Sequence, residues 1–288
     1  RIASEGPKVF YEGDIARQLV EGVRAAGGIW TMEDMAAYQV KEREPIRTLY
    51  NGYELVTASP PSSGGIAIAE MLNIIEGYPL EALDRAQRVH FITEAMRRAY
   101  RDRALYLGDP DFVDVPVERL TSQFYADGLR AGIHPDIATP SEMLPGNDVP
   151  GESTDTTHFS IIDADGNMVA ATLTVNLAFG NRFMVPGTGF VLNNEMDDFS
   201  AKEGVPNAFG LIGFEANAIA PRKRPLSSMT PTFIKGKDKI GILGTPGGSR
   251  IITMVLLGIL DFMEGNGPMS WVSLPRFHHQ YVPDRISA

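Results

Sequence analysis

Apolar residues in the first part of the chain alternate between helical spacing and β-type runs. Ile15, Leu19 and Val23 recur every four positions before a glycine pair, which predicts an amphipathic helix over residues 14–26. Two β-rich runs flank Asn51 and Gly52, a dipeptide that favours the tight turn of a β-hairpin. The predicted hairpin strands cover residues 46–50 and 53–58, and the further predicted helices cover residues 32–37, 66–76 and 83–106.

A long polar stretch interrupts this pattern. Residues 136–155 are rich in Pro, Ser, Gly and acidic residues without periodicity, which predicts an exposed linker. Two β-rich runs follow at 157–162 and 168–174, and the turn-forming residues 163–167 between them predict a second hairpin. The same turn resembles a calcium loop, but Thr174 stands where such a loop needs a bidentate glutamate, so the hairpin is favoured.

The last third of the chain contains a strand, a turn and a helix in succession. Residues 240–244 predict a short strand, 245–249 a tight glycine turn and 250–262 an apolar helix. The most apolar stretch, residues 251–263, overlaps this helix, but a glycine and an aspartate interrupt it. No apolar run therefore reaches the length of about 18 residues that a membrane-spanning helix requires.

Composition narrows the classes of function. The 288 residues are 43% hydrophobic, which is enough for a sizeable core, and the formal net charge is -10. Because acidic residues outnumber basic ones 36 to 26, a nucleic-acid partner is disfavoured. The absence of cysteine excludes disulfides, thiolate metal sites and a cysteine nucleophile. The chain begins without an initiator Met or the apolar core of a signal peptide, so we expect a piece of a longer protein.

Common catalytic and cofactor motifs are missing from the sequence. It contains no Gly-x-Ser-x-Gly elbow, no His-Glu-x-x-His, no Walker loop and no Gly-x-Gly-x-x-Gly. His278 and His279 are adjacent and would diverge on a regular element, while His90, His134 and His158 stand alone. The sequence therefore offers no metal-binding constellation, and we expect neither a metal nor an organic cofactor.

A threonine pair at the end of the linker has chemical significance. A threonine hydroxyl is a poor nucleophile unless a base adjoins it, and a free α-amine on the same residue is such a base. Cleavage after Asp155 would give Thr156 that amine and divide the chain into residues 1–155 and 156–288. From the pair alone, however, Thr156 and Thr157 are equally well explained as β-formers entering a strand.

Five segments beginning with this pair resemble the gamma-glutamyltranspeptidase family in their order and spacing. They are Thr-Thr-His-Phe-Ser from Thr156, Asp-Gly-Asn from Asp165, Leu-Asn-Asn-Glu-Met-Asp-Asp-Phe from Leu192, Arg-Pro-Leu-Ser-Ser-Met-Thr-Pro from Arg224 and Gly-Thr-Pro-Gly-Gly-Ser-Arg from Gly244. Upstream, residues 60–65 and 106–110 look like the end of the family's large subunit. The resemblance thus covers nearly the whole chain.

This resemblance implies a fold and a subunit organisation. The fold would be an α/β (α+β) four-layer αββα sandwich of the N-terminal nucleophile hydrolase type, of which the chain is a fragment. Residues 1–155 would be the C-terminal part of the large subunit, and residues 156–288 the small, catalytic subunit, truncated at its C-terminus. Both subunits would come from one precursor, and the family location would be periplasmic or extracellular.

The resemblance also implies roles for residues of the catalytic centre. Thr156 would be the nucleophile, and Thr174 the second threonine whose hydroxyl bonds to it. Gly247 and Gly248 would form the oxyanion hole, since glycine N–H groups at a helix start can stabilise developing negative charge. Two other interpretations of the glycine pair are a simple strand-to-helix turn and a phosphate cradle, and the lack of a following Lys-Ser or Lys-Thr weakens the second.

The donor pocket follows from the same resemblance, because a γ-glutamyl group carries an α-ammonium and an α-carboxylate. The matching residues are Asn176, Glu195 and Asp198 for the ammonium, with Ser227 and Ser228 for the carboxylate. Without the neighbouring motifs, these acids and serines would be interpreted as a solvated loop and a turn.

Two departures from the family pattern limit this transfer of roles. The family's carboxylate-binding arginine belongs to a region upstream of residue 1. A lid is expected over residues 201–217, with Phe209 where many bacterial relatives have a tyrosine.

The implied reaction is cleavage of glutathione or another γ-glutamyl amide through an acyl-enzyme on Thr156, with transfer to water or an amino-acid acceptor. A glutaryl or cephalosporin acylase of the same fold is the nearest alternative, although Asn176, Glu195 and Asp198 favour a γ-glutamyl donor. A non-catalytic relative that binds γ-glutamyl ligands is a second alternative from a different class.

Overall fold

The computed structural model describes residues 1–144 and 156–288, so Asp155 lies outside the described residues. By packing, the chain forms two compact units. Unit 1 contains residues 1–43 and 175–194, and unit 2 contains residues 44–174 and 195–288. These units are defined by packing, and the division into residues 1–155 and 156–288 stays a prediction. Most of the predicted site residues belong to unit 2.

Unit 1 consists of short helices and an irregular segment that share one apolar core. The helices are α1 (Ile2–Glu5), α2 (Lys8–Tyr11), α3 (Asp14–Ala25) and α4 (Met32–Ala36). Leu19 and Val23 of α3 pack with Val185 of the irregular segment, and the helix appears where its apolar spacing predicts it. The Thr31 side chain caps α4 in a reciprocal capping box with Asp34.

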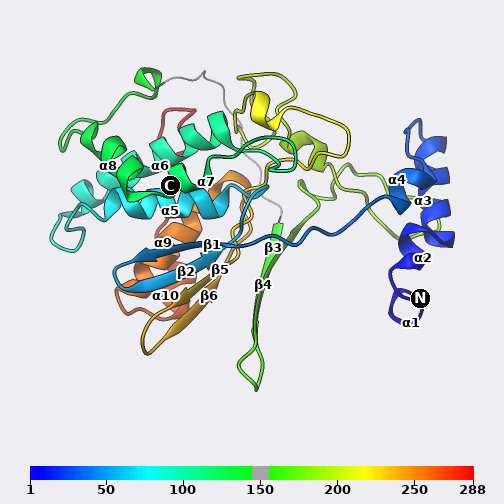
Figure 1. Cartoon of the computed structure of the whole chain (residues 1–288), viewed down its shortest axis with the longest axis horizontal. Helices are drawn as coiled ribbons and strands as arrows, with labels where there is room; N and C mark the ends of the chain where they lie inside the picture. The colour runs from blue at the N-terminus through cyan, green and yellow to red at the C-terminus, as the bar shows by residue number, and fades with distance from the viewer. Residues whose placement is uncertain (145–155) are drawn as a thin grey trace. The chain divides into compact units, whose positions relative to one another are not determined.

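Unit 2 is built on a four-stranded antiparallel sheet in the order β1-β2-β5-β6. Its strands are β1 (Ile46–Tyr50), β2 (Tyr53–Thr57), β5 (Thr232–Lys235) and β6 (Ile240–Leu243). The predicted hairpin β1–β2 is confirmed, with Asn51 at φ 48° and Gly52 at φ 79° in its turn. Strand β5 lies between β2 and β6, so segments far apart in the sequence are neighbours in the sheet (Figure 1).

Helices pack on this sheet and supply most of the core. The described helices of unit 2 are α5 (Gly64–Ile75), α6 (Arg85–Tyr106), α7 (Val117–Leu120), α8 (Gln123–Ala131), α9 (Ile251–Met263) and α10 (Pro268–Ser273). Every residue of α5 is buried, and the helix contacts β1, α6 and α9. It begins at a glycine because the backbone approaches closely: a Cβ on Gly64 would lie 2.0 Å from Thr230 Oγ1.

A separate two-stranded sheet carries the predicted nucleophile. Strands β3 (Thr156–Ile162) and β4 (Met168–Thr174) pair antiparallel as a long hairpin (Figure 1). Asp163 receives hydrogen bonds from the backbone N–H groups of Asp165 and Asn167, so the predicted turn is confirmed.

One described residue of the predicted exposed linker is buried. Ser141 lies in the 3-10 helix η1 (Ser141–Met143) and is only 3% exposed. Its N–H donates to Asp284 Oδ2 at 2.8 Å and its hydroxyl to the Tyr281 carbonyl oxygen at 2.6 Å. These polar partners at the C-terminal end of the chain compensate for the burial of a polar residue.

Candidate functional site

Thr156 and Thr174 face each other at the end of the β3–β4 hairpin. Thr156 is the first residue of β3 and Thr174 the last of β4, and the strand register pairs them directly. Their hydroxyl oxygens are 3.3 Å apart, which is a long hydrogen bond. The antiparallel register therefore brings together the two threonines, eighteen positions apart, that the family resemblance pairs, and their catalytic roles stay a prediction.

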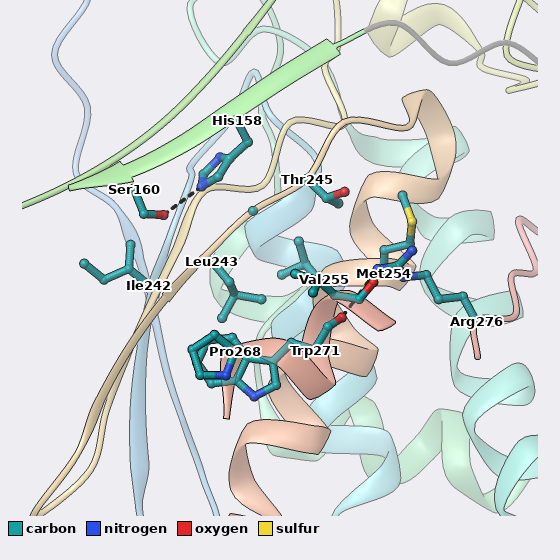
Figure 2. Close-up of a pocket in the computed structure, with 13 residues that line it drawn as sticks. His158, Ser160, Ile242, Leu243, Thr245, Met254, Val255, Pro268, Trp271 and Arg276 are labelled. Atoms are coloured by element: carbon teal, nitrogen blue, oxygen red, sulfur yellow. Dashed lines mark hydrogen bonds between the residues drawn. The ribbon is translucent and has the colours of Figure 1, made fainter. Parts of the chain in front are cut away.

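His158 lies two residues along β3 and lines a cavity of about 250 Å³. Its Nδ1 is 2.8 Å from Thr172 Oγ1 and its Nε2 is 3.1 Å from Ser160 Oγ. Figure 2 shows the imidazole beside residues of β6 and α9, with Trp271 of α10 opposite. Burial lowers the pKa of His158, so the ring is neutral at neutral pH. Alternate residues of a strand share a face, so the cavity adjoins the strand face that bears Thr156.

Gly244 provides the space for this histidine, and its replacement tests the packing. A Cβ on Gly244 would lie 2.2 Å from His158 Nδ1 and Cε1, so Gly244→Ala must displace the ring. We expect a loss of about 1–3 kcal/mol, seen as a lower Tm of the full-length protein. Gly128→Ala is the matched control, because a Cβ there meets open space within helix α8, and its Tm should stay equal or rise. An unchanged Tm for Gly244→Ala would mean that the ring moves aside at no cost.

The predicted oxyanion glycines form a backbone turn that few other residues could adopt. Gly247 has φ 139° and Gly248 φ 54°, and the 3-10 helix η4 (Gly248–Arg250) continues from them into α9. Across residues 1–144 and 156–288, neither glycine N–H donates a hydrogen bond to another protein group. The two N–H groups are therefore available to an external acceptor.

Buried side chains from α6 and α9 hold this turn in place. The Tyr100 hydroxyl donates to the carbonyl oxygen of Ser249, and the Thr253 hydroxyl donates to that of Arg250 at 3.0 Å. His278 Nδ1 lies 2.8 Å from Thr253 Oγ1, and the His278 ring meets Tyr100 edge-on. Carbonyl oxygens just after Gly248 are thus fixed, which limits movement of the N–H groups before them.

The hydroxyl oxygens of Ser227 and Ser228 each accept one hydrogen bond from a protein group. Met229 N–H donates to Ser227 Oγ at 3.0 Å, and Arg103 Nη2 donates to Ser228 Oγ at 3.4 Å. A serine hydroxyl has one hydrogen to donate, and neither contact uses it. Both serines can therefore donate to an anion such as a carboxylate.

Arg103 is a feature of this region that sequence reasoning missed. Its side chain is 4% exposed on α6, and its Nε donates to Ser63 Oγ at 3.0 Å. No carboxylate forms an ion pair with it within the described ranges. Burial lowers the pKa of Arg103, and interactions with Tyr100 and Asp198 oppose that effect. Arginines are so frequent along this helix that no pattern in the sequence distinguishes this one.

Asp198 is a partly buried carboxyl group whose pKa is raised. It ends the 3-10 helix η2 (Glu195–Asp198), where it lies near Glu195. Burial and the negative charge of Glu195 raise the pKa of Asp198 to about 7, while Arg103 acts in the opposite direction. Burial also raises the pKa of Glu195. A carboxyl group poised in this way gains from a cationic ligand, which stabilises its charged form.

Asn176, the third predicted ammonium ligand, belongs to unit 1 and is described there. Its side chain is buried at 2% exposure, with φ at 74°. Its Nδ2 donates to the Asn194 carbonyl oxygen at 3.0 Å. The amide is thus held firmly within its own unit.

The predicted lid segment is anchored to the acidic helix η2. Ala208 N–H donates to Asp197 Oδ2 at 2.8 Å, and Asn217 Nδ2 donates to the Asp198 carbonyl oxygen at 2.7 Å. The Phe209 ring is buried at 6% exposure, and the Phe209 carbonyl oxygen accepts from Gln280. A lid role for this segment stays a prediction.

Two further observations concern metal ions and membranes. Among the residues described, no group of three His, Asp or Glu side chains is arranged to hold a metal ion. None of the helices in the described ranges combines the length and apolarity needed to cross a bilayer.

The fold defines a class of protein. A solved cephalosporin acylase from Bacillus halodurans matches with a TM-score of 0.77 and 27% identity, covering 96% of this chain and 48% of that one. The fold is that of the N-terminal nucleophile hydrolases, a mixed class with antiparallel sheets, and the predicted fold class is confirmed.

Sequence comparison identifies the family within this class. The family model described as Gamma-glutamyltranspeptidase matches residues 1–288. A glutathione hydrolase proenzyme from Pseudomonas sp. (strain A14) is 48% identical, covering 98% of this chain and 50% of that protein. An acylase ACY 1 proenzyme from Pseudomonas sp. (strain SE83) is 41% identical, covering 91% of this chain and 45% of that protein. The chain belongs to the gamma-glutamyltranspeptidase family, as its motifs predict, and spans about half the length of these curated relatives.

Proposed function

We propose that the full-length protein is an autoprocessing γ-glutamyl amide hydrolase and transpeptidase acting on glutathione and related compounds. The observation that supports this most strongly is the contact between the hydroxyl groups of Thr156, the first residue of β3, and Thr174. Cleavage after Asp155 would make Thr156 an N-terminal residue with its own general base. The 48% identical relative named a glutathione hydrolase proenzyme supports the same activity.

In the proposed reaction, the Thr156 hydroxyl oxygen attacks the γ-carbonyl carbon of the donor. The α-amine of Thr156 accepts the hydroxyl proton and then delivers it to the departing amine, so that an ester on Thr156 replaces the amide. The N–H groups of Gly247 and Gly248 stabilise the oxyanion of the tetrahedral intermediate. Water, or the amine of an acceptor amino acid, then attacks the ester and regenerates Thr156.

The donor would be recognised at its α-carbon. Asp198 and Glu195 bind the α-ammonium, and the hydroxyl groups of Ser227 and Ser228 donate to the α-carboxylate. The raised pKa of Asp198 supports this assignment, because a partly buried carboxylate is stabilised by a bound cation. No metal or organic cofactor takes part in the proposed steps.

A pair of chromogenic donors tests the proposal. We expect the full-length protein to release p-nitroaniline from γ-glutamyl-p-nitroanilide at least about tenfold faster than from glutaryl-p-nitroanilide, which lacks the α-amino group. Preference for the glutaryl donor would instead support an acylase, the function named in the 41% identical relative. Release from neither donor, with measurable binding of L-glutamate, would support a non-catalytic binding protein.

A further inference from the structure

Arg103 joins two serines that belong to different segments of unit 2. Its Nε donates to Ser63 Oγ at 3.0 Å and its Nη2 to Ser228 Oγ at 3.4 Å. Ser63 Oγ in turn donates to the Ser227 carbonyl oxygen at 2.8 Å, and Ser63 N–H donates to the same oxygen at 2.8 Å. One guanidinium thus fixes the backbone of Ser227 through Ser63 and contacts Ser228 directly.

The direction of these bonds determines what the serine hydroxyl groups can do. A guanidinium only donates, so Ser63 Oγ and Ser228 Oγ must both act as acceptors toward Arg103. The Ser63 hydrogen is used on the Ser227 carbonyl oxygen, whereas the Ser228 hydrogen has no such use in the described contacts. Arg103 therefore orients Ser228 as a donor toward an anion, and its positive charge strengthens that donor.

We propose that Arg103 is a positioning residue of the donor site, which orients Ser228 toward the substrate α-carboxylate. This inference rests on the proposed γ-glutamyl function. Arg103 would supply a positive charge to the proposed donor site from within this chain. The side chain is 4% exposed, so it acts through Ser228 and by its charge.

The charges around Asp198 make this role measurable. Burial and the negative charges of Glu195 and Asp197 raise the pKa of Asp198, and Arg103 is the cation that lowers it. Tyr100 is the other titratable group that acts on Arg103, and burial raises the pKa of Tyr100 above the range in which enzymes are assayed. Removal of the Arg103 charge should therefore shift the Asp198 titration upward.

The test measures competitive inhibition of the full-length protein by L-glutamate between pH 5.5 and 8.5. L-Glutamate carries both α-groups of the donor, and its binding does not require the α-amine of Thr156 to act as a base. For Arg103→Met we expect Ki to rise by about tenfold or more and the acidic midpoint of Ki to move upward by at least about 0.5 pH unit. For Arg103→Lys, which keeps the charge, Ki should rise but the midpoint should stay near the wild-type value.

Arg98→Lys is the matched control on the same helix. Arg98 is also buried, but its ion pair is with Glu94, so its replacement should lower Tm without moving the midpoint. A raised Ki for Arg103→Met with an unmoved midpoint would reduce Arg103 to a structural role and overturn the proposal. If Arg103→Met does not fold, the test uses Arg103→Lys. A wild-type Ki of Arg103→Lys for L-glutamate would also overturn the proposal. A wild-type protein without γ-glutamyl turnover would refute the proposed function itself, which is a different outcome.

Discussion

Thr156→Ala is expected to leave the full-length protein as one uncut chain that releases no γ-glutamyl group. The physical reason is that the hydroxyl oxygen needed for attack is gone, both for peptide cleavage after Asp155 and for donor turnover. Intact mass would show a single chain instead of two, and the γ-glutamyl anilide assay would show no burst and no steady state. The expected loss in kcat is at least about 10³-fold, since a covalent mechanism cannot proceed without its nucleophile.

Thr157→Ala is the matched control for this experiment. Thr157 is the next residue of β3 and exposed, and adjacent strand residues point to opposite faces. We expect normal cleavage and kcat within about threefold of wild type, because surface substitutions away from the reacting groups have small effects. Normal subunits from Thr156→Ala would contradict the self-cleaving role of Thr156, even if turnover were lost.

The hairpins and helices with strong local signals could be predicted from the sequence. The Asn51-Gly52 turn has both residues at positive φ, and α3 ends at Ala25 just before the glycine pair. Strand β3 begins at Thr156, one residue before the predicted strand, because its register with Thr174 extends the ladder by one pair. Local preference and tertiary packing agree at these places, which is why pattern alone was sufficient.

Strand β5 shows where local patterns fail. It spans only Thr232–Lys235, and no sequence pattern marked it as a strand. It is nevertheless paired on both sides, with Val56 opposite Phe233 on one side and Ile242 on the other. Its structure depends on pairing with a segment more than 170 residues away, as in the Thr57–Thr232 hydroxyl contact. Such pairing leaves little trace in a window of neighbouring residues.

The same limit separates the predicted from the missed site residues. The threonine pair and the serine pair belong to short motifs, so a resemblance could identify them. Arg103 lies 40 residues from Ser63 and 125 residues from Ser228, and only the folded chain brings the three together. Its significance comes from burial without a carboxylate partner in the described residues, which is a three-dimensional property.

Asp198→Asn is expected to lower kcat/KM for γ-glutamyl donors by at least about 30-fold, or about 2 kcal/mol, while leaving the fold intact. Asparagine keeps the size of the side chain but cannot pair as an anion with the substrate ammonium. In the wild type, Asp198 has a pKa of about 7 before the donor binds, so inhibition by L-glutamate should weaken as pH falls below 7. In the variant, this acidic limb should disappear from the pH dependence of Ki.

Asp198→Asn should raise the stability of the fold at neutral and alkaline pH although it lowers activity. Because the pKa of Asp198 is raised from 3.8 to about 7, the unfolded chain ionises first as pH rises, and folding loses stability between about pH 4 and 7. Above pH 7 the full penalty of the partly buried Asp198 charge is present. Asp198→Asn removes that penalty, so its Tm should equal that of wild type near pH 4 and exceed it at pH 8.

Asp197→Asn is the matched control for these two measurements. Its remaining carbonyl oxygen can still accept the Ala208 N–H, so the variant removes one neighbouring negative charge and little else. It should keep kcat/KM within about threefold and move the acidic midpoint slightly downward, because Asp197 raises the pKa of Asp198. A lower Tm for Asp198→Asn at pH 8 would show that the carboxylate stabilises the unliganded fold. A partly buried acid that costs stability when ionised and recovers it when the donor ammonium binds is the arrangement expected of a binding residue.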